Sequence, residues 1–176
     1  NSGPGSLSGV FVHERHANRK DLNRFTGWWS HNKQTRFKMR DEFDQLPGAE
    51  GWQLSNPPIL SMAAIRASLD VIETAGFENL CKKSTQLTGY FEYLINVLNN
   101  SDIKIITPSD PKQRGCQLSI QVTNADKTLH EKLTQAGIIT DWREPDVIRC
   151  APVPLYNSYM DVFQFVERLK LILNKT

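Results

Sequence analysis

Two apolar patterns of helical spacing fill residues 58–100 and constrain the fold more than any other feature of the sequence. From Ile59 to Ile72, and again from Leu80 to Leu98, apolar residues recur three and four positions apart. Together they exceed the usual helix length of about 10–14 residues, and Gly76 interrupts the pattern. We therefore expect two consecutive helices that divide the chain into residues 1–57, the helical segment 58–100, and residues 101–176.

Beyond residue 100, predicted strands and helices alternate. The clearest strand is 116–122, where apolar and polar residues alternate strictly, and shorter strands are predicted at 103–106, 138–139 and 147–148. A helix is predicted from Asp126 to Ala136 with Gly137 after it, and a terminal helix at 162–173 with Ser158 or Asp161 as its cap. The order β-β-α-β-β-α indicates a small α+β unit, with an antiparallel sheet covered by helices on one face.

The part before residue 58 has a different character. Residues 1–9 are rich in glycine and serine, and residues 10–12 predict a short strand. From about Arg15 to Gly51 no period is sustained. An irregular stretch of this length usually carries a function or packs against another part of a larger protein.

Bulk composition excludes several classes of protein. Hydrophobic residues make up 39% and charged residues 23% of the chain, as in globular proteins. No apolar run approaches the ~20 residues of a membrane-spanning helix, and no secretory signal is recognisable. The three cysteines, Cys81, Cys116 and Cys150, form no CxxC pair, so we expect reduced thiols in a cytoplasmic protein and no metal site. A net charge of +2 does not by itself indicate a polyanionic partner.

Residues 27–40, GWWSHNKQTRFKMR, mix aromatic and basic side chains. One interpretation is an anion site, in which the Trp28 indole N–H and the Arg36 guanidinium bind a phosphate or carboxylate. A second is a surface that packs on another chain. A third is a non-catalytic module that binds single-stranded nucleic acid by stacking.

Two further positions have both a structural and a functional interpretation. Ser55 and Asn56 precede Pro57-Pro58, so they either cap the following helix or line a polar pocket. Arg149 lies in an apolar, strand-like run and needs a partner there. That partner is either an internal carboxylate or the carboxylate of a substrate. No Ser-His-Asp or Cys-His arrangement is evident, so nucleophilic catalysis by this chain is not expected.

Several motifs occur in the same order as in a known family, and together they cover essentially the whole chain. On these motifs the chain resembles the kynureninases. They are Asn1-Ser2-Gly3, Gly9 to Glu14, Gly27-Trp28, Thr35 to Met39, Ser55 to Pro58, Leu87 to Tyr90, Arg114 to Leu118, and Ile148-Arg149 with Ala151 to Ser158.

The resemblance implies the C-terminal part of a fold type I enzyme that uses pyridoxal 5′-phosphate (PLP). Residues 1–57 would be the last part of the large cofactor-binding domain, and residues 101–176 would form the small domain. Residues 58–100 would form the helices that connect the two. The whole protein would be a cytoplasmic homodimer with its active site at the subunit interface, without nucleic-acid or membrane partners. It would hydrolyse kynurenine or 3-hydroxykynurenine between Cβ and Cγ to an anthranilate and alanine, in tryptophan catabolism and NAD biosynthesis.

The resemblance also implies residue roles. Trp28 matches a tryptophan that bonds the cofactor phosphate, and Asn56, with Ser55 beside it, lines the cofactor and the substrate ring. Phe37 matches an aromatic near that ring, and Arg149 matches the arginine that binds the substrate α-carboxylate. The lysine that forms a Schiff base with the cofactor would lie upstream of Asn1. We therefore expect no catalytic residue within the chain, and no activity of the chain alone.

Overall fold

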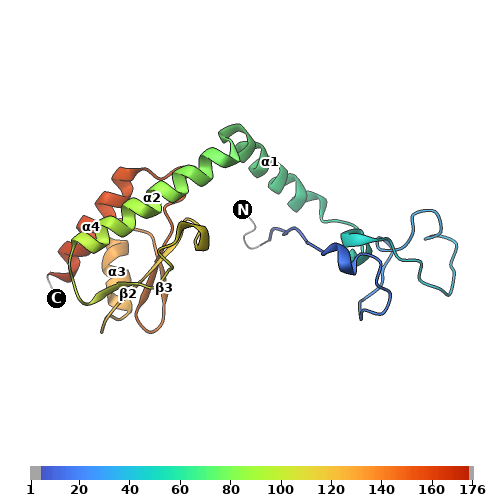
Figure 1. Ribbon diagram of the computed structural model, residues 1–176, viewed down its shortest axis with the longest axis horizontal. Coiled ribbons are helices and arrows are strands. Elements are labelled where there is room, and N and C mark those ends of the chain that lie inside the picture. Colours follow the sequence, from blue (N-terminus) through green and yellow to red (C-terminus); the bar gives the residue numbers. More distant parts are fainter. Residues whose placement is uncertain (1–4, 175–176) are drawn as a thin grey trace. The chain divides into compact units, whose positions relative to one another are not determined.

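A computed structural model describes residues 5–174, so the Asn1-Ser2-Gly3 part of the resemblance lies outside the described residues. The chain forms two compact units, residues 1–71 and 72–176, which are described separately below (Figure 1). The division into 1–57, 58–100 and 101–176 stays a prediction about the whole protein.

The two helices predicted between residues 58 and 100 are present. Helix α1 spans Ile59–Ala75 and helix α2 spans Phe77–Val97. Gly76 between them has a φ of +79°, a conformation that glycine adopts readily and that ends a helix. The break predicted at Gly76 is therefore confirmed.

The second unit contains a four-stranded antiparallel sheet. Its strands are β1 (Ile103–Ile105), β2 (Leu118–Val122), β3 (Asp141–Arg143) and β4 (Val147–Cys150), in the order β1-β2-β4-β3. The small antiparallel sheet predicted from the sequence is confirmed. The strand predicted at Ile138–Ile139 is wrong, because the Ile138 N–H still bonds Leu133 O at the end of the preceding helix. Strand β3 begins only at Asp141.

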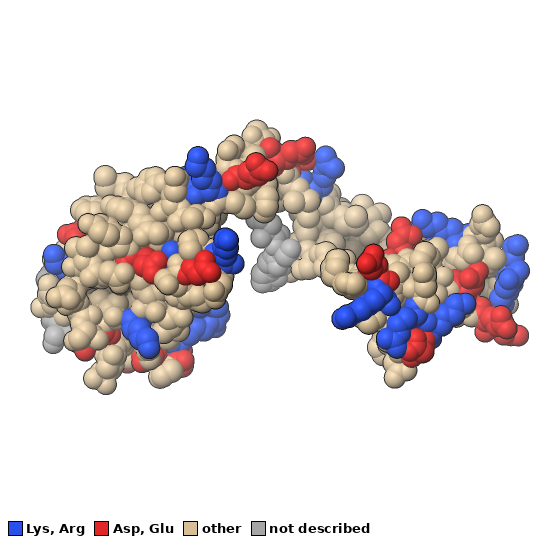
Figure 2. Space-filling view, in the orientation of Figure 1, with Lys and Arg blue, Asp and Glu red and all other residues tan. Residues whose placement is uncertain are grey.

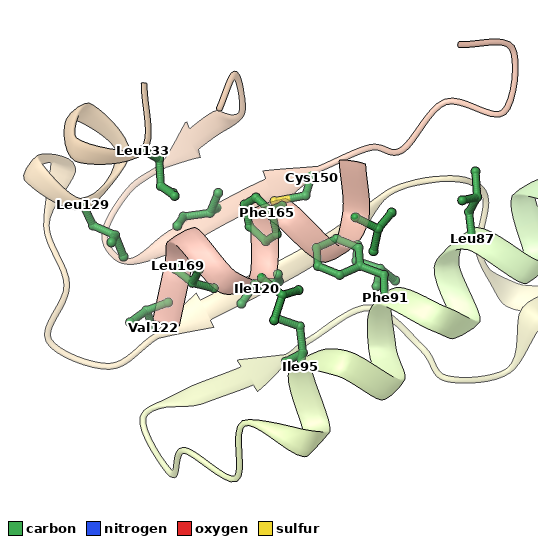
Figure 3. Packing of buried hydrophobic residues seen from close by; sticks show 14 residues of the cluster. Leu87, Phe91, Ile95, Ile120, Val122, Leu129, Leu133, Cys150, Phe165 and Leu169 are labelled. Carbon is green, nitrogen blue, oxygen red and sulfur yellow. The ribbon is translucent and has the colours of Figure 1, made fainter. Parts of the chain in front are cut away.

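The core of this unit lies between one face of the sheet and helices α2, α3 (Lys127–Gln135) and α4 (Tyr159–Leu173) (Figure 3). Every second residue of β2 is buried, as the alternation in the sequence predicts. Ile120 and Ile148 pair in register on this face and are fully buried. Ser158 caps α4 and Asp161 completes the capping box, so both predicted cap residues take part.

Irregular backbone dominates the first unit, as predicted. From residue 5 to the start of α1, its regular elements are two 3₁₀ turns, η1 (Glu14–His16) and η2 (Gly48–Trp52), and an isolated antiparallel bridge between His31 and Gln45. The strand predicted at residues 10–12 is wrong, since Val10 and Phe11 are exposed and no strand pairs with them in the described chain. Among the described residues, no helix combines the length and apolar character that crossing a bilayer requires.

Candidate functional site

The first unit brings two of the predicted site segments together through a glycine. The backbone of Gly27 lies so close to that of Leu54 that a Cβ on residue 27 would stand 2.0 Å from the Leu54 carbonyl oxygen. Such a distance is far below van der Waals contact, so only glycine fits without a backbone shift. The approach places Trp28, next in sequence to Gly27, beside the segment that continues into Ser55 and Asn56.

A buried hydroxyl fixes the turn that carries Trp28. Ser30 is fully buried, and its Oγ accepts from the Gly27 N–H at 3.1 Å while donating to the Gly27 carbonyl at 3.0 Å. The Ser30 carbonyl in turn accepts from the Leu46 N–H at 2.8 Å. Because hydrogen bonds hold both ends of the turn, the backbone that carries Trp28 and Trp29 is fixed. Ser30 was not among the predicted site residues. The one signal in the sequence is a small hydroxyl residue three positions after a glycine.

Trp28 and Phe37, two of the predicted site residues, lie together. Their ring centroids are 5.4 Å apart with the planes tilted by 41°. Both side chains are largely exposed, Trp28 at 52% and Phe37 at 72%. The Trp28 indole N–H has no hydrogen-bond partner within residues 5–174. The half-exposed Trp28 thus keeps an indole donor that no described residue uses, next to the Phe37 ring.

Arg36 is bound to its own loop. Its guanidinium carbon lies 4.9 Å from the centroid of the Trp29 ring, and Nη2 donates to the His31 carbonyl at 3.2 Å. Its Nε is buried and has no partner in the described part of the chain. Arg36 and Trp28 line the same open hollow, together with Thr26, Gly27, His31 and Arg40. Asp41 and Glu42 also line the hollow, so its formal charge is balanced. Arg36 itself is partly committed, because one of its donors bonds the His31 carbonyl.

Ser55 and Asn56 are exposed and directly precede Pro57, Pro58 and helix α1. Neither side chain makes a hydrogen bond with the described residues. The Ser55 carbonyl accepts from the Gln53 side chain at 3.0 Å, which holds the backbone of the segment. The capping interpretation is therefore not observed, and both polar side chains remain available for a ligand.

Arg149 lies in the second unit, at the centre of the sheet. It occupies β4 between Ile148 and Cys150, whose side chains are buried in the core, so its own side chain lies on the opposite face of the sheet. The side chain is 33% exposed, and its Nη2 forms an ion pair with Asp141 of β3. Its Nε is buried without a partner among the described residues. The internal ion pair weighed from the sequence is thus present, and N–H donors remain for a second carboxylate.

Asp141 is the residue of this site that the sequence did not reveal. It faces Arg149 in register and also pairs with Arg143, whose Nη2 lies 3.0 Å from Asp141 Oδ2. The hydrogen bond from Arg149, followed by the positive charges of Arg143 and Arg149, keeps the pKa of Asp141 below its ordinary value. Asp141 therefore stays ionised at neutral pH.

The sequence of the chain matches those of known proteins. Residues 80–169 match the family described as the kynureninase C-terminal domain. The chain is 57% identical over 170 residues to a kynureninase from Myxococcus xanthus (strain DK1622), and 51% identical over 174 residues to one from Koribacter versatilis (strain Ellin345). These matches cover 97% and 99% of the chain but only 40% and 41% of the relatives. The chain thus spans about two fifths of their length.

Solved structures resemble the chain at low sequence identity. A cysteine desulfurase from Thermococcus onnurineus NA1 has a TM-score of 0.67 at 14% identity, over 87% of this chain and 39% of that one. The cystine lyase C-DES, as a K223A mutant with glycine linked to PLP, has a TM-score of 0.63 at 17% identity, over 85% and 38%. This likeness shows the fold, an α+β C-terminal part of a fold type I enzyme.

Proposed function

Because this chain belongs to the kynureninase family, we propose that the whole protein hydrolyses kynurenine or 3-hydroxykynurenine between Cβ and Cγ. The products are anthranilate or 3-hydroxyanthranilate, and alanine. We further propose that it acts in the cytoplasm as a homodimer, with the active site at the subunit interface, in tryptophan catabolism and NAD biosynthesis. The observation that supports the proposal is the Gly27–Leu54 contact, which brings the backbone segment that carries Trp28 next to the one that continues into Ser55 and Asn56.

The residues of the first unit fit one side of a PLP site. The Trp28 indole N–H is a directed donor suited to a phosphate oxygen, and Arg36 and Arg40 line the same hollow, although Asp41 and Glu42 balance their charge there. Asn56 is proposed to contact the cofactor and the substrate ring, with Ser55 beside it and Phe37 against the ring. When bound, PLP supplies the electron sink for the bond cleavage. The chain's own residues bind the cofactor and orient the substrate.

Arg149 is proposed to bind the α-carboxylate of the substrate. A guanidinium matches a carboxylate with two parallel N–H donors, and Arg149 keeps such donors after its bond to Asp141. The side chain is partly exposed and fixed on a strand of the sheet, so it can hold a substrate in one orientation.

The alternative of a nucleic-acid module has less support. Arg36 lies over the Trp29 ring and Phe37 packs against the Trp28 ring, so each tryptophan already has a stacking partner within the loop. On the side shown in Figure 2, Lys and Arg of the first unit are interspersed with Asp and Glu and form no continuous basic face.

The test is the reaction of the whole protein with PLP and kynurenine, followed by the fluorescence of the anthranilate that is released and by the alanine formed. We expect both products in equal amounts, and 3-hydroxyanthranilate from the hydroxylated substrate. A PLP-loaded protein that releases neither product from either substrate would refute the proposal.

A further inference from the structure

Asp141 and Arg149 face each other across the antiparallel pair of β3 and β4. Their neighbours Trp142 and Ile148 also pair in register and turn towards the core, so Asp141 and Arg149 share the opposite face of the sheet. Asp141 Oδ2 accepts from Arg149 Nη2. Cross-strand partners on one face are fixed by the register of the sheet, so this contact does not depend on a mobile loop.

Only some of the N–H donors of Arg149 are free to bind a ligand. A guanidinium has five N–H groups, one on Nε and two on each terminal nitrogen. The Nε of Arg149 is buried and has no partner among residues 5–174, and Asp141 takes one donor of Nη2. The donors left for a ligand are therefore on the two terminal nitrogens. A carboxylate can bind such a pair end-on with two parallel hydrogen bonds.

The charges of this cluster add up to an excess of positive charge. Asp141 pairs with both Arg143 and Arg149, so one carboxylate lies between two guanidinium groups. Asp141 can hold the Arg149 side chain without cancelling the attraction of the cluster for an anion. On β2, Ser119 is paired with Arg149, and His130 bonds the Thr140 carbonyl at 3.2 Å. The two carboxylates of the turn are engaged elsewhere, Glu144 with the Trp142 indole and Asp146 with Gln121, and neither forms an ion pair with the arginines in the described chain.

We propose that Asp141 is a positioning residue, which fixes the guanidinium of Arg149 so that its two terminal nitrogens face the substrate carboxylate. This inference rests on the proposed function of Arg149. An arginine side chain has several rotatable bonds, and an arginine without Asp141 would sample other rotamers and hold the carboxylate less often. Asp141 acts only through Arg149 and does not itself touch the substrate.

The first experiment replaces Asp141 in the whole PLP-loaded protein. Asp141→Ala is expected to raise KM for kynurenine about tenfold or more, the size expected when a charge-assisted hydrogen bond is lost. The kcat and the affinity for PLP should change much less. Asp141→Asn keeps an acceptor oxygen at the same place and should recover part of the loss.

The matched control is Asp146→Ala. Asp146 lies in the turn between the same two strands, and its side chain accepts from Gln121 and forms no hydrogen bond or ion pair with Arg149 in the described chain. It should leave KM near the wild-type value. An equal rise of KM in the Asp146 and Asp141 variants would mean that the hairpin is merely distorted, and it would overturn the proposal.

The second experiment separates this inference from the proposed function. Arg149→Ala alone should raise KM strongly, and adding Asp141→Ala to it should cause no further loss of kcat/KM, because Asp141 acts through the arginine. Two results would overturn the positioning role alone. One is a full additional loss of kcat/KM in the double variant. The other is a wild-type KM in Asp141→Ala while Arg149→Ala has a raised KM. A normal KM in Arg149→Ala would instead remove the proposed role of Arg149, and this inference with it.

Discussion

The α-carbon of Gly27 packs against the backbone of Leu54, so that any Cβ at residue 27 would meet the Leu54 oxygen, carbonyl carbon and α-carbon at 2.0, 2.7 and 2.8 Å. Because these are backbone atoms, they cannot move aside as the end of a side chain could. Gly27→Ala should therefore separate Trp28 from the Ser55-Asn56 segment. We expect a weaker affinity for PLP and a lower melting temperature of the whole protein, measured by cofactor titration and thermal unfolding.

The control for this substitution is Gly89→Ala in helix α2. A Cβ there meets nothing within 4 Å in the described chain, and its φ is not in the left-handed region. Alanine is favoured over glycine in a helix by about 1 kcal/mol, so this variant should be neutral or slightly more stable. If Gly27→Ala behaves like Gly89→Ala in both measurements, the close approach does not hold the site.

The indole N–H of Trp28 is the only group of that side chain that can donate a hydrogen bond to a phosphate. Trp28→Phe keeps an aromatic ring against Phe37 and removes the donor. We expect PLP affinity to fall about tenfold or more, since a hydrogen bond to a charged group contributes about 1.5–3 kcal/mol. Equilibrium dialysis of PLP measures the change. Trp29→Phe is the control, because its ring serves Arg36 as a cation–π partner and phenylalanine retains that face.

The regular elements of this chain could be predicted because each follows from local pattern. The alternation of 116–122 marked strand β2, and Gly76 marked the break between α1 and α2. Ser158 and Asp161 were recognisable as caps because a capping box lies within four consecutive residues. The strand predicted at residues 10–12 had an apolar, strand-like sequence, but no strand pairs with it among residues 5–174. A pattern alone cannot supply the neighbouring strand that a sheet requires.

The contacts that hold the candidate site residues within each unit could not be predicted, because they depend on the folded backbone and on the register of the strands. Gly27 and Leu54 are far apart in sequence, and only the folded backbone shows that one must be glycine to approach the other. Asp141 faces Arg149 only in one register, and a shift by one residue would place Trp142 there instead. The resemblance to a family identified Trp28, Ser55, Asn56, Phe37 and Arg149, whose roles stay predictions. It did not identify Ser30, which bonds the turn that carries Trp28, or Asp141, which bonds Arg149.

Ser55 and Asn56 look like helix caps in the sequence, but they do not cap α1 in the structure. Ser55→Ala and Asn56→Ala should therefore leave the free energy of unfolding nearly unchanged while raising KM for 3-hydroxykynurenine. Ser158→Ala is the contrasting variant, because Ser158 does cap α4 and its loss should cost about 1 kcal/mol. Chemical denaturation and steady-state kinetics give the two quantities. A loss of stability in the Ser55 or Asn56 variants equal to that of Ser158→Ala would show that they act as caps after all.

Asp161 couples the stability of helix α4 to pH. Its carboxylate accepts from the Ser158 N–H at 2.7 Å and from the Ser158 hydroxyl at 2.9 Å, and these bonds lower its pKa below the ordinary value of 3.8. A carboxyl whose pKa is lower in the folded state stabilises the fold above its unfolded pKa. That contribution is lost as the pH falls through the folded value.

Asp161→Asn should therefore be less stable than the wild type at pH 6–7, and the difference should shrink as the pH falls below 3.8. Urea unfolding of both proteins across this range measures the difference, and a gap that stays constant with pH would mean that the charge of Asp161 contributes nothing to the cap.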